Sequence, residues 1–104
     1  MRGYDGPTVA EILVTRTPGD ADAERFLTRY RVEIHEGEVT TQHDVTLSKR
    51  DFDRLGGVRT PEAFVRDCFT FLLQREPQES ILHSFDVSSI GRYFPEFERT
   101  ITSA

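Results

Sequence analysis

The chain has 104 residues, enough for one hydrophobic core but too few for two, so we expect a single domain over residues 1–104. Hydrophobic residues make up 37% of the sequence and eight of them are phenylalanine, which excludes a disordered chain. The net charge of −5 disfavours general attraction to nucleic acid or anionic lipid, and the single cysteine excludes an intrachain disulfide.

The first residues offer little to a core. Residues 1–7 contain two glycines and a proline, and we expect a loose leader there. They lack the apolar stretch of a secretory signal, and no apolar run approaches the ~18 residues that a membrane helix needs, so the expected location is the cytoplasm and no membrane partner is expected. Residues 8–16 predict a strand, although their broken alternation leaves its buried face open.

A hairpin is the clearest element of the sequence. Residues 26–35 alternate apolar and polar side chains, which predicts a half-buried strand. A two-residue turn at Glu36-Gly37 would pair this strand with residues 39–47, so that their apolar residues share one face. The same register places Arg29 opposite Asp44 on the exposed face.

Two helices should follow the hairpin. Ser48 is suited to cap a helix over Lys49–Leu55, which Gly56-Gly57 would end. Thr60 and Pro61 open a second helix, which should run to about Arg75 because Pro77 restricts the residue before it. A wide apolar stripe on this helix should cover the sheet.

The sequence after Pro77 is less regular. It predicts a short helical turn over residues 79–83, a helix from Asp86 to about Phe94, and a loose tail at 99–104. The expected fold class is α+β, a three-stranded antiparallel β-meander followed by two to four helices packed on one face of the sheet.

Two resemblances bear on function. The segment 71–97, FLLQREPQESILHSFDVSSIGRYFPEF, resembles the C-terminal part of a family of small uncharacterised bacterial proteins. This resemblance implies a bacterial origin and says nothing about chemistry. Residues 42–48 as a strand, with helices over 49–55 and 60–74, resemble ribbon-helix-helix DNA-binding domains, in which strands from two copies pair and enter the major groove. This second resemblance implies a dimeric DNA-binding regulator.

The sequence carries no recognisable catalytic or cofactor motif. His35, His43 and His83 have no ligand-like neighbours at metal-binding spacing, and His43 is expected as a hydrogen-bonded histidine at the edge of the core. Cys68 lies among apolar residues and is expected to be a small buried hydrophobe. We therefore predict no catalytic residue, no metal ligand and no cofactor.

Two surfaces stand out as candidate sites. The outer face of the hairpin is a candidate for recognising an anionic partner, with a merely solvated face as the alternative; its residues are Arg29, Arg31, His35 and Gln42. The C-terminal segment is more aromatic than a short tail needs, and it belongs either to the core or to an interface. Its apolar residues are Phe85, Ile90, Tyr93, Phe94, Phe97 and Ile101.

These features favour a noncatalytic protein-interaction or homo-oligomerising module, whose partner is another protein or a second copy of the chain. One alternative is the ribbon-helix-helix-like regulator; nucleic acid is otherwise an unexpected partner of this acidic chain. The other is an enzyme or small-ligand-binding protein, which would need a concave pocket with polar groups near His43, Cys68 or His83.

Overall fold

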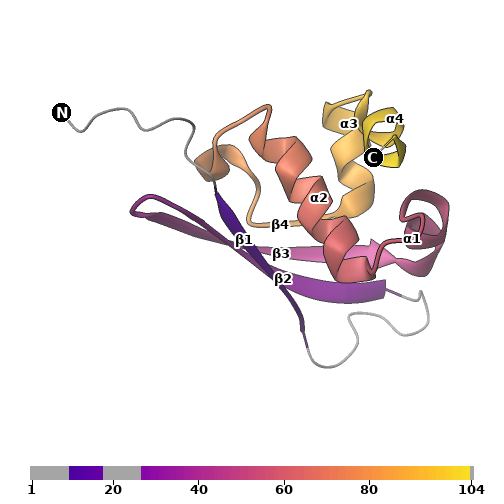
Figure 1. Ribbon diagram of the computed structural model, residues 1–104, viewed down its shortest axis with the longest axis horizontal. Coiled ribbons are helices and arrows are strands. Elements are labelled where there is room, and N and C mark those ends of the chain that lie inside the picture. Colours follow the sequence, from indigo (N-terminus) through magenta and orange to yellow (C-terminus); the bar gives the residue numbers. More distant parts are fainter. Residues whose placement is uncertain (1–9, 18–26, 104) are drawn as a thin grey trace.

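The computed structural model describes residues 10–17 and 27–103, so the expected leader at 1–7 lies outside the described residues. The fold is α+β, with the helices on one face of a four-stranded sheet (Figure 1). β1 (Glu11–Arg16), β2 (Leu27–Glu36) and β3 (Val39–Ser48) run antiparallel in the expected order.

The sheet has four strands rather than the three that the sequence predicts. β4 (Ser84–Asp86) lies parallel to β3, which makes the sheet mixed and its order β1-β2-β3-β4. Three residues are too few to show the period-2 alternation by which a strand is recognised. β4 forms because the chain returns to the sheet after α2 and η2, which brings Phe85 beside Val45.

The hairpin turn lies one residue later than predicted. Glu36 pairs with Val39, so the two turn residues are Gly37 and Glu38, and Gly37 adopts a φ of 64° that favours glycine at that position. The predicted pairs are therefore wrong by two residues, and Arg31 rather than Arg29 lies opposite Asp44. A shift of two keeps every side chain on its predicted face because the side-chain period of a strand is two.

The core lies between the inner face of the sheet and α2 (Pro61–Leu73). Strand β1 adds Ile12 and Val14 to this inner face, while Leu13 is exposed on the outer one. The remaining sheet residues of the core are Tyr30, Val32, Ile34, Val45 and Leu47, and α2 contributes Phe64, Val65, Cys68, Phe69, Phe71 and Leu72.

Both helix starts are capped as the sequence predicts. α1 (Lys49–Leu55) begins at Ser48, whose hydroxyl accepts a hydrogen bond from the Asp51 amide at 3.0 Å. The Thr60 hydroxyl accepts one from the Ala63 amide at 3.1 Å, with Pro61 in the first turn of α2. α2 ends at Leu73, two residues before the predicted end.

The C-terminal part consists of short elements: η2 (Gln78–Ser80), η3 (Val87–Ser89), α3 (Ile90–Tyr93) and α4 (Phe97–Thr102). The region predicted as a loose tail is helical as far as Thr102, and its Ile101 is buried. No helix in the described ranges is both long and apolar enough to cross a membrane.

Arg59 ties the last helix to the rest of the domain. Its guanidinium donates to the carbonyl oxygens of Leu55 and Ile101, at 3.0 and 2.9 Å, and pairs with Asp67 at 2.9 Å. One side chain therefore joins the end of α1, the middle of α2 and the end of α4. These contacts, together with the burial of Phe97 and Ile101, hold the C-terminal helix against the domain.

Candidate binding pocket

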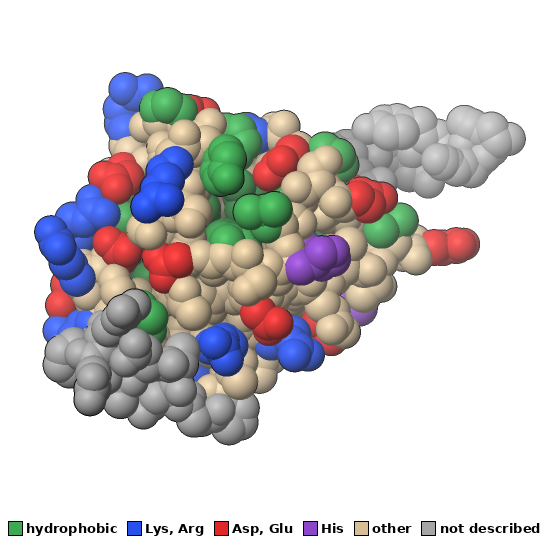
Figure 2. Space-filling model, turned by 180° about the vertical axis from the view of Figure 1, so that it is seen from behind, with side chains coloured by type: hydrophobic (Ala, Val, Ile, Leu, Met, Phe, Trp, Pro, Cys, Tyr) green, Lys and Arg blue, Asp and Glu red, His purple; other side chains and the backbone are tan. Residues whose placement is uncertain are grey.

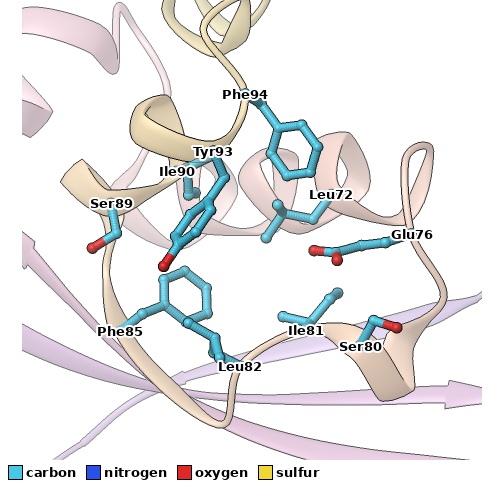
Figure 3. Close-up of a pocket in the computed structure, with 10 residues that line it drawn as sticks. All are labelled: Leu72, Glu76, Ser80, Ile81, Leu82, Phe85, Ser89, Ile90, Tyr93 and Phe94. Atoms are coloured by element: carbon cyan, nitrogen blue, oxygen red, sulfur yellow. The ribbon is translucent and has the colours of Figure 1, made fainter.

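A pocket of about 220 Å³ opens between the end of α2, the segment from η2 to β4, and α3 (Figure 3). The walls are mostly aliphatic and aromatic. The lining residues are Leu72, Glu76, Ser80, Ile81, Leu82, Phe85, Ser89, Ile90, Tyr93 and Phe94.

The rim of the pocket exposes large hydrophobic side chains to water. Tyr93 is 68% exposed and Leu82 is 54% exposed, while Phe85 and Phe94 are half-buried. Figure 2, which views the molecule from behind, shows hydrophobic side chains gathered near the middle of that face, with acidic side chains close by. Covering such side chains is favourable, since each Å² of apolar surface removed from water contributes roughly 25 cal/mol.

Four of the lining residues carry polar side chains, and they do not all face the same way. In Figure 3 the side chains of Glu76 and Tyr93 point toward the pocket, whereas the hydroxyl groups of Ser80 and Ser89 point away from it. Glu76 is half-buried, and its carboxylate forms no hydrogen bond or ion pair with any residue that the structure describes. The pocket therefore combines apolar walls with one carboxylate that has no partner in the described chain.

Nearby charged groups are already paired with each other. Arg75, next to Glu76, donates from Nε to Glu96 at 2.8 Å, and its guanidinium lies over the Phe71 ring at 3.6 Å from the centroid. The hydrogen bond from Arg75 lowers the pKa of the Glu96 carboxyl. Glu96 therefore has a cationic partner, whereas Glu76 has none among the described residues.

A buried chain of polar groups holds one wall of the pocket against the sheet. The Gln78 amide donates from Nε2 to the Ile34 carbonyl and to the Thr41 hydroxyl, both at 3.0 Å. The His43 Nδ1 lies 2.7 Å from the Leu82 carbonyl and its Nε2 lies 2.9 Å from the Thr41 hydroxyl. These contacts fix the turn that presents Ile81 and Leu82 to the pocket.

His43 is only 1% exposed, so it lies inside the core rather than at its edge. The Leu82 carbonyl can only accept, so Nδ1 carries the proton and Nε2 accepts from Thr41. Burial lowers the pKa of His43, and the hydrogen bond to Leu82 partly opposes that effect. His83 stacks on His43 with ring centroids 5.8 Å apart.

The C-terminal apolar residues divide between core and pocket, the two outcomes that the sequence left open. Phe97 and Ile101 are buried in the core, where Phe71 and Phe97 pack edge to face. Tyr93, Phe94 and Phe85 line the pocket, together with the buried Ile90. The sequence did not mark the other lining residues as a site because they come from separate segments, although Ile81 and Leu82 are adjacent apolar residues beside a turn.

The candidate anion-facing residues lie together on the outer face of β2 and β3, but acidic groups accompany them. Arg31 pairs with Asp44 at 3.1 Å. Glu33 accepts from His35 at 3.1 Å and from Gln42 at 3.2 Å. The positive charge of this face is therefore largely offset, and Arg29 alone of the four has no recorded partner among the described residues.

The three residues near which the enzyme alternative expected a pocket do not line this one. Cys68 is buried, and burial raises the pKa of its thiol well above the usual range. His43, His83 and Cys68 are all absent from the pocket lining. In the described part of the chain, no three His, Cys, Asp or Glu side chains are grouped so that they could hold a metal ion.

The ribbon-helix-helix resemblance does not extend to the arrangement of the strands. β3 corresponds to the strand that would pair with a second copy, yet it pairs with β2 along one edge and, at residues 44–46, with β4 along the other. Comparisons with protein-family models, with curated proteins and with solved structures found no match to this chain. A function must therefore be argued from the site itself.

Proposed function

We propose that the protein is a noncatalytic interaction module that captures a hydrophobic side chain of a partner protein in this pocket. The observation that carries the proposal is the exposure of Leu82 and Tyr93 at the mouth of an apolar pocket. Partly exposed aromatic residues around a concave apolar site are typical of the centre of a protein interface.

The size of the pocket favours a side chain over a cofactor. Pockets for drug-sized ligands and cofactors usually hold ~300–1,000 Å³. This pocket holds about 220 Å³, which is below that range. An engineered apolar cavity of ~150 Å³ accepts benzene, so one aromatic or branched aliphatic side chain fits here.

The lining also favours binding over catalysis. Nucleophilic catalysis needs a nucleophile within hydrogen-bond reach of a base. The pocket supplies one carboxylate and three hydroxyl groups, and two of those hydroxyls, on Ser80 and Ser89, point away from it. A hydrophobic anchor from another protein uses what the pocket does offer, which is apolar wall and an exposed aromatic rim.

A display experiment tests the proposal with a matched pair of variants. A library of random linear peptides on phage is panned against the full chain, and the enriched peptides are titrated against wild type, Tyr93→Ser and Val58→Ser. Val58 is fully exposed, apolar and outside the pocket, so it controls for the loss of any surface hydrophobe.

We expect the enriched peptides to share an aromatic or leucine residue, and Tyr93→Ser to weaken their binding about 10-fold or more. Val58→Ser should leave their affinity unchanged. Equal effects of the two substitutions, or a failure of the library to enrich any hydrophobic sequence, would count against an interaction site at this pocket.

A further inference from the structure

We infer that the partner segment carries a lysine or arginine next to its hydrophobic anchor, and that this cation pairs with Glu76. The inference rests on the proposed function and adds the chemistry of the partner. It is carried by the position of the Glu76 carboxylate, which points into an apolar pocket and has no partner among the described residues.

Filling the pocket changes the surroundings of this carboxylate. Glu76 is already half-buried, and an occupant that packs against its neighbours Leu72 and Ile81 would remove more water from it. A carboxylate that loses water without gaining a donor is costly, whereas a charge-assisted hydrogen bond to lysine or arginine replaces the lost hydration. The pocket should therefore select anchors that bring a cation and reject purely apolar or acidic segments.

The described part of the chain does not provide that cation. Arg75 is adjacent in sequence, but its guanidinium is held by Glu96 and the Phe71 ring. Arg92 is exposed on α3 and does not line the pocket. No cation among the described residues pairs with Glu76, so a cation of a ligand can take that place.

A second copy of the chain fits the pocket poorly. To bind there it would have to insert an exposed hydrophobic side chain, and among the described residues outside the pocket the candidates are Leu13, Val39 and Val58. Val39 lies beside Glu38 and opposite Glu36, which would repel Glu76. Leu13 lies opposite Glu33 in the sheet, so it too would bring an acid rather than a cation toward Glu76.

Val58 is followed by Arg59, whose guanidinium is already bound to Leu55, Ile101 and Asp67. A two-fold dimer centred on the pocket would also bring two Glu76 carboxylates together, which is unfavourable. These observations favour a different protein as the partner.

The test extends the peptide selection with charge variants of the full chain. The library is panned in parallel against wild type, Glu76→Gln and Glu79→Gln. Glu79 is an exposed acid three residues away that does not line the pocket, so it controls for general electrostatic attraction. Glu76→Lys is a fourth target, which reverses the charge at the same place.

We expect wild type and Glu79→Gln to enrich peptides with lysine or arginine within a few positions of the hydrophobic anchor. Glu76→Gln should keep the anchor and lose the basic preference, and Glu76→Lys should select aspartate or glutamate instead. In a synthetic peptide, replacing that lysine by glutamine should weaken binding to wild type about 5-fold and leave binding to Glu76→Gln unchanged.

Other outcomes separate the two proposals. Persistence of the basic preference in Glu76→Gln overturns the inference, while the proposed function stands as long as Tyr93→Ser still weakens binding. Binding of free phenethylamine as tightly as the selected peptides overturns it too, since the pocket would then be a small-amine site. Absence of any enriched hydrophobic anchor removes the proposed function itself.

Discussion

The outer face of the sheet and the pocket both combine charged and apolar groups, but they differ in how the charges are partnered. On the outer face, Arg31 lies against Asp44, and Glu33 accepts from His35 and Gln42. In the pocket, the carboxylate of Glu76 has no such neighbour in the described chain. Charge alone therefore does not single out a site. The pocket differs from the outer face in placing its carboxylate inside an apolar cavity.

The first prediction tests whether neighbouring aromatic residues really divide between core and pocket. Phe97→Ala should lower the free energy of unfolding by ~3–5 kcal/mol, because Phe97 is buried and packs edge to face on Phe71. Tyr93→Ala, four residues earlier and mostly exposed, should cost under ~1 kcal/mol. Urea unfolding of both variants gives the two values, and similar losses would erase the distinction.

The second prediction concerns a charge that is partnered inside the domain. Arg59→Lys should lower stability by ~2 kcal/mol, because an ammonium group cannot reach the carbonyls of Leu55 and Ile101 and Asp67 at once. Arg54→Lys is the matched control, since Arg54 pairs only with acids near the surface and should cost under ~0.5 kcal/mol. Thermal unfolding compares the stabilities of the two variants. An Arg59→Lys variant as stable as wild type would contradict the role of Arg59 in joining α1, α2 and α4.

The third prediction sharpens the link between the core and the pocket wall. Burial lowers the pKa of His43 below its ordinary 6.5, so between these two values the folded chain binds fewer protons than the unfolded chain. Stability should therefore fall as the pH drops below 6.5, with a limiting slope of about 1.4 kcal/mol per pH unit. This loss of stability also affects the pocket, because His43 donates to the carbonyl of Leu82, which lines it.

Denaturant unfolding between pH 7 and pH 5 measures this slope. His43→Gln should flatten it. A slope that survives in His43→Gln would show that another group is responsible.

The smallest expected effect belongs to the outer face. A double-mutant cycle of Arg31→Gln and Asp44→Asn should give a coupling free energy below ~1 kcal/mol, because both side chains are about half exposed and screened by water and salt. A coupling of several kcal/mol would mean that this ion pair is more than a solvated surface contact.

The sequence predicts the parts of this fold whose signal is local. The alternation of residues 26–35 and the caps at Ser48 and Thr60 each lie within one short window, and the structure contains both helices and the hairpin. The hairpin register differed by two residues because Gly37 occupies the first turn position rather than the second. Alternation determines which face a side chain takes, whereas the turn determines its partner across the sheet.

The pocket was beyond sequence reasoning for a related reason. Its residues come from the end of α2, from η2, from β4 and from α3, and only the tertiary fold brings them together. A lone glutamate before a proline, such as Glu76, looks like ordinary surface. Gln78 bonds to Thr41, 37 residues away, and His43 bonds to Leu82, 39 residues away, so no local pattern predicts the network that positions Leu82.

Methyl-resolved NMR of the full chain, titrated with a selected hydrophobic-basic peptide, tests the central claim most directly. Leucine, isoleucine and valine methyl groups report on the pocket through Leu82 and Ile90, and on the rest of the surface through Leu13 and Val39. We predict that the pocket methyl signals shift with increasing peptide while those of Leu13 and Val39 stay in place. Shifts confined to Leu13 or Val39 would move the binding site away from the pocket, to the outer face of the sheet or to the end of the hairpin, and contradict the account.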